Sequence, residues 1–333
     1  MDRKPVLCIY IGDASGIGPE IVAKLVDNGF LSEHCLPLII GDIRVMEQGA
    51  SFINRKLDLK VIDSPDEIDW SCAKPNFLNI EGLDPAADYA IGVPCAKAGK
   101  YTGDMLKEII KLAEDNVFDG FVFAPLNKTA LKLGGYNYAS ENEILGDLTN
   151  SPDTTEMSVT DGLWSARICS HVPFKDIVNY ITKDSILKMI KQAHKTMVQA
   201  GISSPRIAVC GLNPHNGENG TCGREEIEII EPAVKEAVSM GINAMGPYSA
   251  DTIFIKAFAG EYDIVVSLYH DQGQIAMKVR GIQNTVTVHT ELPFITLTPS
   301  HGTAYDIAGK GIADTGATEK AVILAAKMAS SKK

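Results

Sequence analysis

Short apolar runs alternate with longer segments of helical periodicity along most of this chain. Runs rich in β-branched or aromatic residues predict buried strands at 118–123, 206–212 and 262–268. The segments between such runs repeat apolar residues at helical spacing, which predicts helices at 19–27, 103–114, 186–199, 224–239 and 318–328. Strands that alternate with helices form a parallel sheet wrapped by helices. The sequence therefore predicts an α/β fold.

The length of 333 residues and the hydrophobic share of 45% allow one large α/β unit or two lobes of ordinary domain size. The sequence has no internal repeat, low-complexity tract or linker rich in Pro, Gly or Ser. If there are two lobes, we therefore expect a shared sheet or crossing strands to join them, with a cleft between them.

The charge balance narrows the class of partner. A net charge of −11 and a pI near 5.1 argue against nucleic acid or a membrane surface, since both call for clustered Lys and Arg. Seven cysteines without a C-x-x-C pair fit a reducing compartment. The stretch before the first strand-like run, at 6–11, is too short for an export signal or a membrane span. We expect a cytoplasmic protein with a small-molecule substrate.

Three histidines each follow an apolar, strand-like run: His171, His215 and His270. The carboxyl ends of parallel strands line the ligand crevice of an open α/β sheet. Three neutral imidazoles that meet there would suit zinc, cobalt or another divalent ion and leave coordination positions open for a substrate. The alternative is that each is a hydrogen-bonded structural histidine, and position alone leaves the two interpretations equally good.

Polar residues and glycines surround these histidines. The segment that contains His215 offers Gly211, Asn213, Gly217 and Gly220 before a predicted helix, which indicates close approach to a polar ligand or a solvated loop with a helix cap. Asp271 follows His270 directly, and Asp251 precedes a predicted helix. Each acid either shapes a metal site or caps a helix.

Three further segments stand at predicted strand ends. Lys128 comes just after the run 118–124, where desolvation or a metal would lower its pKa for proton transfer; the alternative is a surface lysine. The loop 12–20 lacks the Lys-Ser/Thr of a Walker A motif and is interpreted as a tight turn. The small-residue loop 301–311 either wraps an adenosine or simply turns.

Taken together, these segments resemble the 4-hydroxythreonine-4-phosphate dehydrogenase (PdxA) family of vitamin B6 biosynthesis, with its paralogues acting on 4-phospho-threonate or 4-phospho-erythronate. The resemblance runs almost end to end, and its segments are 12–20, 125–128, 211–226, 246–252, 269–273, 292–294 and 301–309. The last loop is also similar to the cofactor loop of isopropylmalate dehydrogenases. Their order and spacing make the resemblance specific.

The resemblance implies two α/β/α lobes of the isopropylmalate dehydrogenase kind, with a cleft between them. We expect the first lobe at 1–130 plus 300–333 and the second at 131–299. It also implies a homodimer whose site is shared between subunits, with one histidine of the metal set supplied by the partner. NAD or NADP and one divalent metal, Zn, Co, Mg or Mn, are the implied cofactors. The implied cofactor-binding residues are Gly211, Asn213, Gly217, Gly220, His301, Gly302, Thr303 and Asp306.

The expected substrate pocket departs from the family pattern. Lys278 matches a substrate-binding lysine of the family, whereas Glu141 and Asn142 stand where the family has His-Thr. Thr287 and Thr296 stand where the family has an asparagine and an arginine. The loss of an arginine and the gain of a carboxylate predict weaker recognition of a phosphate.

We therefore predict a metal-dependent dehydrogenase that oxidises a secondary hydroxyl of a small hydroxy acid or phosphohydroxy acid and passes a hydride to NAD(P). Decarboxylation follows where a carboxylate lies β to the new ketone. Lys128, Asp251 and Asp271 are the predicted catalytic residues. A dehydrogenase of a non-phosphorylated diol or hydroxy acid, a metal hydrolase and an inactive ligand-binding protein remain as alternatives.

Overall fold

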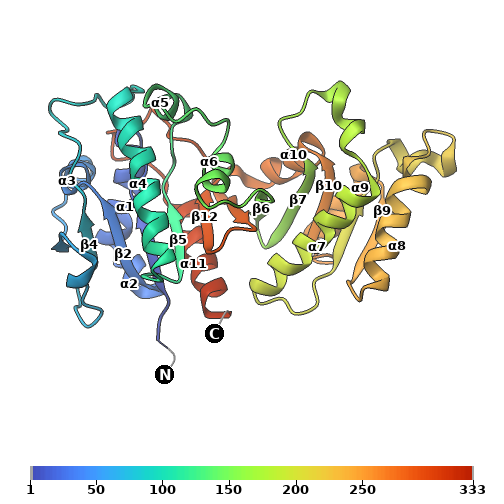
Figure 1. The fold of residues 1–333 in the computed structure, drawn as a ribbon, viewed down its shortest axis with the longest axis horizontal. Helices are drawn as coiled ribbons and strands as arrows, with labels where there is room; N and C mark the ends of the chain where they lie inside the picture. Colours follow the sequence, from blue (N-terminus) through green and yellow to red (C-terminus); the bar gives the residue numbers. More distant parts are fainter. Residues whose placement is uncertain (1–2, 332–333) are drawn as a thin grey trace. The chain divides into compact units, whose positions relative to one another are not determined.

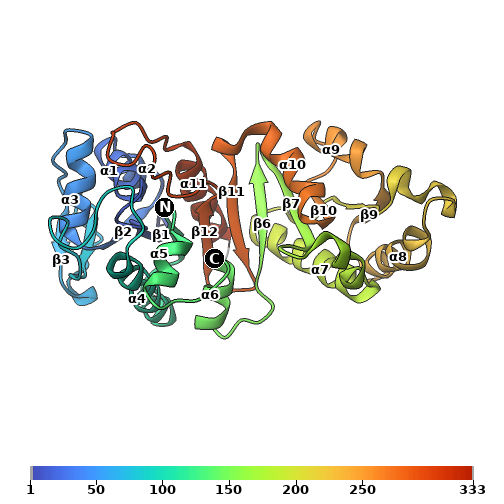
Figure 2. The same ribbon diagram turned by 90° about the horizontal axis from the view of Figure 1, so that it is seen from above.

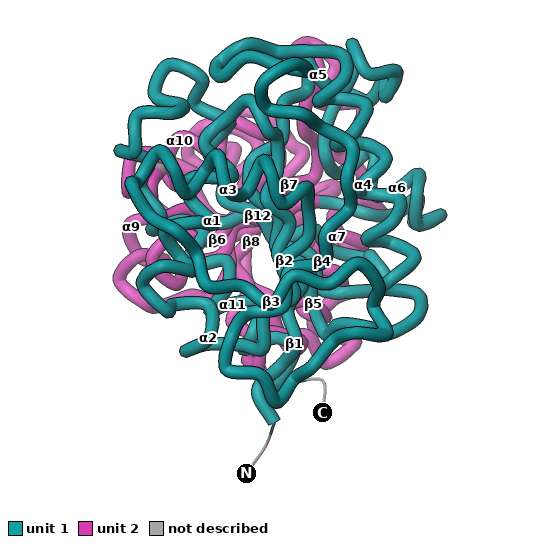
Figure 3. The backbone as a smooth tube through the Cα atoms, turned by 90° about the vertical axis from the view of Figure 1, so that its left-hand side faces the viewer, with its two compact units in different colours: residues 1–155, 286–333 teal, residues 156–285 magenta. Residues whose placement is uncertain are grey.

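The computed structural model describes residues 3–331, which form two compact units (Figure 3). The first unit contains the chain up to Thr155 and again from Val286 onward, and the second contains Glu156–Thr285. The segments 131–155 and 286–299, expected in the second lobe, thus lie in the first unit. Hydrogen bonding explains part of this difference, because β12 (Ile295–Pro299) pairs in parallel with β5 (Gly120–Phe123), and β11 (Val286–Thr290) pairs with β12.

The first unit is built on a mostly parallel sheet. Its strand order is β3-β4-β2-β1-β5-β12-β11, and β11 is antiparallel to β12. The remaining strands are β1 (Val6–Tyr10), β2 (Leu36–Gly41), β3 (Lys60–Ile62) and β4 (Asn76–Asn79). β1 is buried at every position, as expected for a central strand covered on both faces.

Helices cover both faces of this sheet, with α1, α3 and α11 on one face and α4 on the other (Figure 2). The helices are α1 (Gly18–Asp27), α2 (Phe30–His34), α3 (Ile43–Phe52), α4 (Ala96–Glu114), α5 (Lys128–Leu133), α6 (Glu141–Leu148) and α11 (Gly316–Ser331), with a 3-10 turn η1 (Pro65–Glu67). α1 has Pro19 in its first turn, where no intrahelical amide bond is lost, and buries Ile21 and Leu25.

The strands of the second unit lie in the order β6-β7-β10-β8-β9, and all are parallel except β6. The strands are β6 (Thr155–Thr160), β7 (Leu163–Cys169), β8 (Ile207–Cys210), β9 (Ala244–Tyr248) and β10 (Ile264–Tyr269). Figures 1 and 2 show α7 (Lys183–Gln199) and α8 (Glu231–Ser239) on one face, and α9 (Ala250–Phe258) and α10 (His270–Gly281) on the other. Its short helical turns are η2 (Phe174–Tyr180), η3 (Pro214–Gly220), η4 (Glu226–Ile230) and η5 (Ile282–Asn284).

The predicted elements are present with shifted ends. The helix expected at 103–114 begins earlier, at Ala96, after Cys95 accepts a hydrogen bond from the amide of Ala98. The helix expected at 224–239 is instead a π-helical turn, η4, followed by α8. Pro232, which has no amide hydrogen to donate to the preceding turn, stands at this junction. The parallel strands of each unit bring their carboxyl ends to one edge of its sheet, and this positions the candidate site residues.

Candidate functional site

In the second unit, two of the three singled-out histidines lie side by side. His171 follows β7 and His270 follows β10, and these strands are parallel neighbours. The two imidazole rings are 6.0 Å apart between centroids. The Nδ1 atom of His270 is 2.7 Å from the Oδ1 atom of Asp271, so the other ring nitrogen is left for a ligand. A carboxylate that holds one nitrogen of an imidazole is the usual support of a metal-binding histidine.

His215 stands apart on an exposed turn. Its Nδ1 atom is 2.8 Å from Oε1 of Glu218, and this contact raises the pKa of His215. Residues 215–219 all have positive φ between 44° and 76°, a conformation that costs non-glycine residues free energy. Within residues 3–331, no group of three or more His, Cys, Asp or Glu side chains is placed to hold a metal ion. A single chain thus pairs His171 with His270 and leaves out His215.

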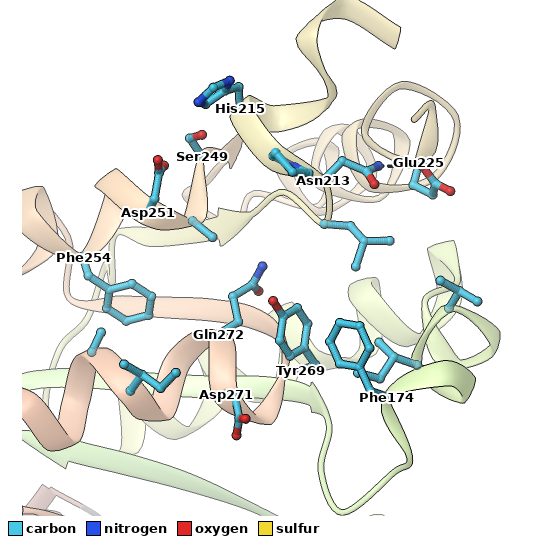
Figure 4. A pocket seen from close by; sticks show the side chains of 17 residues that line it. Phe174, Asn213, His215, Glu225, Ser249, Asp251, Phe254, Tyr269, Asp271 and Gln272 are labelled. Atoms are coloured by element: carbon cyan, nitrogen blue, oxygen red, sulfur yellow. Dashed lines mark hydrogen bonds between the residues drawn. The ribbon is translucent and has the colours of Figure 1, made fainter. Parts of the chain in front are cut away.

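A cavity of about 810 Å³ opens at the carboxyl ends of β8, β9 and β10 (Figure 4). Its walls are largely apolar and include Phe174, Phe254 and Tyr269, while its polar lining includes Asn213, His215, Ser249, Asp251, Asp271 and Gln272. The carboxylates of Asp251 and Asp271 point in opposite directions in Figure 4. The two predicted catalytic acids therefore border the same cavity without meeting each other.

The glycine-rich segment after β8 is organised around a carboxylate that sequence reasoning missed. Glu226 is 3% exposed and accepts hydrogen bonds from the amides of Leu212 (2.8 Å) and Asn213 (2.7 Å) and from the Asn213 side chain (2.9 Å). A side-chain atom added at Gly217 would lie 2.6 Å from Glu226, and one at Gly211 would lie 2.5 Å from Asn216. These glycines therefore allow close packing of the protein's own side chains, not only of a ligand. The backbone amides that were expected to attract an anionic ligand already donate to the Glu226 carboxylate.

Gln272 is a second residue of the cavity that the sequence did not single out. Its side chain accepts a hydrogen bond from the amide of Leu268 at 2.7 Å and donates one to the carbonyl of Gly211 at 2.8 Å. It thereby ties the end of β10 to the end of β8. Its position two residues after His270, at the start of a helix, was the only sequence signal for this role.

In the first unit, the ends of β1, β5 and β12 meet. Asn127, after β5, donates to the hydroxyl of Thr303 at 3.3 Å, and Tyr305 donates to Asp13 at 2.5 Å. Burial raises the pKa of Asp13, which is 1% exposed, although the Tyr305 hydroxyl opposes that shift. Among the described residues, the buried Oγ of Ser15 and Nε2 of His301 have no hydrogen-bond partner.

The predicted substrate residues of the first unit are mostly engaged with protein groups. The Nζ atom of Lys128 is 3.8 Å from Oε2 of Glu141, and these side chains are 48% and 21% exposed. Asn142 donates to the carbonyl of Thr154 at 3.1 Å and accepts from its hydroxyl at 3.0 Å. Thr287 shares a hydrogen bond of 2.8 Å with Ser300, and Thr296 is 0% exposed. In the second unit, Lys278 is exposed on α10.

Comparison with known proteins identifies the family. Residues 33–325 match the family model described as pyridoxal phosphate biosynthetic protein PdxA. The chain belongs to the PdxA family. A Rhizobium meliloti relative provisionally named 4-hydroxythreonine-4-phosphate dehydrogenase 2 is 40% identical over 100% of this chain and 95% of its own length. An Oceanobacillus iheyensis relative provisionally named D-threonate 4-phosphate dehydrogenase is 38% identical over 100% of both chains.

A solved PdxA-type structure has the same fold. The 4-hydroxythreonine-4-phosphate dehydrogenase of Klebsiella pneumoniae superposes with a TM-score of 0.86 at 33% identity, over 98% of this chain and 99% of that chain. The PdxA membership, the α/β fold class and the assignment as a dehydrogenase are confirmed. Within residues 3–331, no helix is both long enough and apolar enough to cross a bilayer.

The residues present fit the groups that PdxA membership implies. His171 and His270 offer a close pair of imidazoles, one of them oriented by Asp271, which suits a borderline divalent ion. In the first unit, the orphaned Ser15 hydroxyl and His301 nitrogen fit a hydroxyl-rich ligand such as the ribose of a nicotinamide cofactor. Among the described residues other than Gly302 and its two chain neighbours, no atom lies within 4 Å of where a Cβ of Gly302 would be, so there is space for a ligand beside this backbone.

Proposed function

We propose that this PdxA protein is a nicotinamide-dependent dehydrogenase that oxidises a secondary hydroxyl of a small phosphorylated hydroxy acid. The observation that carries the proposal is similarity along the whole chain to two relatives, one named for 4-hydroxythreonine 4-phosphate and one for D-threonate 4-phosphate. A bound oxidised nicotinamide cofactor, NAD(P)⁺, would accept a hydride from the carbinol carbon, and a protein base would accept the hydroxyl proton. Where the product is a β-keto acid, loss of CO2 follows.

The proposed metal site consists of His171 and His270 of one chain and His215 of a second copy. A bound divalent ion would lower the pKa of the substrate hydroxyl, and the site would favour Zn or Co over Mg or Mn, because the donors are nitrogens. Asp271 orients His270 through the 2.7 Å contact. Lys128 is the proposed proton acceptor, and Asp251 borders the cavity that His215 also lines.

We propose a homodimer in which a second copy supplies the third imidazole. Two observations support this: His215 is not gathered with the other two histidines within the described residues, and the same unit exposes large apolar side chains. Phe174, Ile275 and Val279 are 77%, 63% and 84% exposed. Exposed apolar surface of this kind commonly marks a protein interface.

We assign cofactor binding mainly to the loop with His301, Gly302, Thr303 and Asp306. Gly302 and Asp306 are exposed in this loop. Gly211, Asn213, Gly217 and Gly220 are weaker candidates than the sequence indicated, since Glu226 already occupies the local amides. The proposed hydride acceptor is NAD or NADP, and the proposed location of the enzyme is the cytoplasm.

A second candidate is a dehydrogenase of a non-phosphorylated hydroxy acid or diol. The position of Glu141, 3.8 Å from the proposed proton acceptor Lys128, favours it, because a carboxylate beside the reacting group would repel a phosphate. Thr296 offers no replacement cation.

The decisive experiment follows NADH absorbance with purified protein, Zn²⁺ or Co²⁺, and matched substrates: D-threonate 4-phosphate, 4-hydroxythreonine 4-phosphate and their unphosphorylated parents. Turnover of the phosphorylated compounds supports the first candidate, and turnover of the parents alone supports the second. A protein that binds metal, fails to bind NAD(H) in a calorimetric titration and hydrolyses esters would be a metal hydrolase, and the dehydrogenase proposal would be wrong.

A further inference from the structure

Two buried carboxylates hold the two ends of the loop 301–313. Asp13 lies in the turn that follows β1, Glu20 lies in the first turn of α1, and each is 1% exposed. Tyr305, near the start of the loop, donates a hydrogen bond of 2.5 Å to Asp13. At the far end, the amides of Gly311 and Ala313 donate to the two oxygens of Glu20 at 3.1 Å and 2.7 Å.

Lys24 completes the second attachment. Its Nζ atom is 2.9 Å from Glu20 and 2.6 Å from the carbonyl of Ala313, so the ammonium group bridges the carboxylate and the loop. Backbone groups add a third attachment, because the amide of Ile17 donates to the carbonyl of Thr303 at 3.1 Å. The loop has no helix or strand of its own between β12 and α11. Its conformation therefore depends on contacts with other segments, which include these attachments and the hydrogen bond from Asn127 to Thr303.

Burying a carboxylate is costly unless hydrogen bonds and a cation compensate for lost solvation. The local turn does not need a carboxylate at position 20. Glu20 accepts its hydrogen bonds from loop amides that lie 291 and 293 residues away along the chain. Between the two attachments, Asp306 and Lys310 remain exposed. The arrangement restrains both ends of the loop and leaves its middle accessible.

We propose that Asp13 and Glu20 are positioning residues that pre-order the loop 301–313 for the nicotinamide cofactor. This inference rests on the assignment of that loop to cofactor binding in the proposed function. Neither carboxylate needs to touch the cofactor. A loop already held in its binding conformation loses less conformational entropy when the cofactor binds, which strengthens the affinity without a new contact.

The test compares Glu20→Gln with Asp42→Asn. The Glu20→Gln substitution keeps the shape of the side chain and removes its charge. Asp42 is a comparable control: it is also buried in the first unit and also pairs with a cation, Arg44. It accepts hydrogen bonds from the amides of Gly82 (2.8 Å) and Leu83 (3.0 Å) in a different loop, and from the amide of Arg44 (3.0 Å). The readouts are the Kd for NADH without substrate, by calorimetry, and hydrogen exchange of peptides that cover 301–313.

We expect Glu20→Gln to weaken NADH binding about tenfold and to accelerate exchange in 301–313, whereas Asp42→Asn changes neither by more than about twofold. With saturating NAD, kcat of Glu20→Gln should stay close to that of the wild type, so the loss appears in KM. An equal loss of NADH affinity in Asp42→Asn, or faster exchange in Glu20→Gln with unchanged NADH affinity, would overturn the proposal.

Tyr305→Phe provides an independent variant if Glu20→Gln does not fold. It removes one hydroxyl, releases the Asp13 attachment and should also weaken NADH binding with faster exchange near residue 305. Failure of the wild type to bind NADH would instead contradict the proposed function. In that case, faster exchange in the variants would show that the carboxylates order the loop, while the cofactor part of the inference would be wrong.

Discussion

The imidazole rings of His171 and His270 lie 6.0 Å apart at the ends of the neighbouring parallel strands β7 and β10. The two residues are far apart in sequence, and the register of the two strands brings them together. Such a pair offers two nitrogen ligands to one ion but does not close a coordination sphere.

This pair predicts that metal binding depends on both residues. His171→Ala or His270→Ala should weaken Co²⁺ binding by at least about a hundredfold, and Asp271→Asn by about tenfold, because the carboxylate only orients the ring. Visible absorption of Co²⁺ during titration measures these affinities. His34→Ala, on α2 in the other unit, is the control and should bind as the wild type does. Unchanged Co²⁺ affinity in both alanine variants would refute the site.

Removal of the metal should weaken the association of the two subunits. If a second copy supplies the third imidazole, dialysis against a chelator should lower enzyme activity and shift the mass measured by light scattering toward the monomer at low protein concentration. Val279→Asp, at a position 84% exposed, should shift the mass in the same direction without unfolding the chain. A monomer that retains full metal affinity would show that all three ligands come from one chain.

Glu141 should set the balance between phosphorylated and unphosphorylated substrates. Glu141→Gln removes the charge 3.8 Å from Lys128 and should raise the ratio of kcat/KM for D-threonate 4-phosphate over D-threonate by about fivefold, since roughly 1 kcal/mol is the upper range for such a surface charge interaction. Glu143→Gln is the control. Glu143 lies in the same helical turn, but its carboxylate accepts a hydrogen bond from the amide of Ala139 at 2.5 Å. A ratio that moves equally in both variants would attribute the effect to the helix.

Alanine substitutions at Gly302 and Gly16 should distinguish a position that contacts the cofactor from one that only packs against the protein. A Cβ at Gly302 meets open space, so Gly302→Ala should leave the melting temperature within about 2 °C of the wild type, yet weaken NADH binding if the cofactor approaches the backbone there. A Cβ at Gly16 would lie 2.9 Å from the Cβ of Thr303. Unlike Gly302→Ala, Gly16→Ala should therefore lower the melting temperature. Normal NADH affinity in Gly302→Ala would place the cofactor elsewhere.

The pH dependence of stability should reveal the Arg206–Asp263 pair. Asp263 accepts two hydrogen bonds from the Arg206 guanidinium, at 2.8 and 3.0 Å, and the pair lowers the pKa of Asp263. A carboxylate with a lowered folded-state pKa stabilises the protein above its unfolded pKa of about 4, and this contribution is lost as the pH falls through the lower folded value. Asp263→Asn should therefore lower the melting temperature at pH 7, and its difference from the wild type should shrink below about pH 4. Calorimetric scans on both sides of that pH measure it.

Much of the architecture followed from periodicity. The alternation of strand-like and helical segments predicted the parallel α/β fold, because burial on both faces makes central strands such as Val6–Tyr10 apolar throughout. The rule that strand ends carry ligands singled out His171, His270 and Lys128. It did not predict the boundary between the units, because strand pairing decides whether a segment such as β11 joins one sheet or another.

The sequence by itself determined the fold class, the family and the strand-end positions of the candidate residues, since local periodicity and motif order record them. Only the tertiary structure decided which groups meet: Glu226 with the amides after β8, Glu141 with Lys128, and Tyr305 with Asp13, 292 residues away. It also separated His215 from the other two histidines. The physical reason is that hydrogen bonds and charge pairs act over a few ångströms of space, whereas the distance along the chain does not specify which side chains come that close.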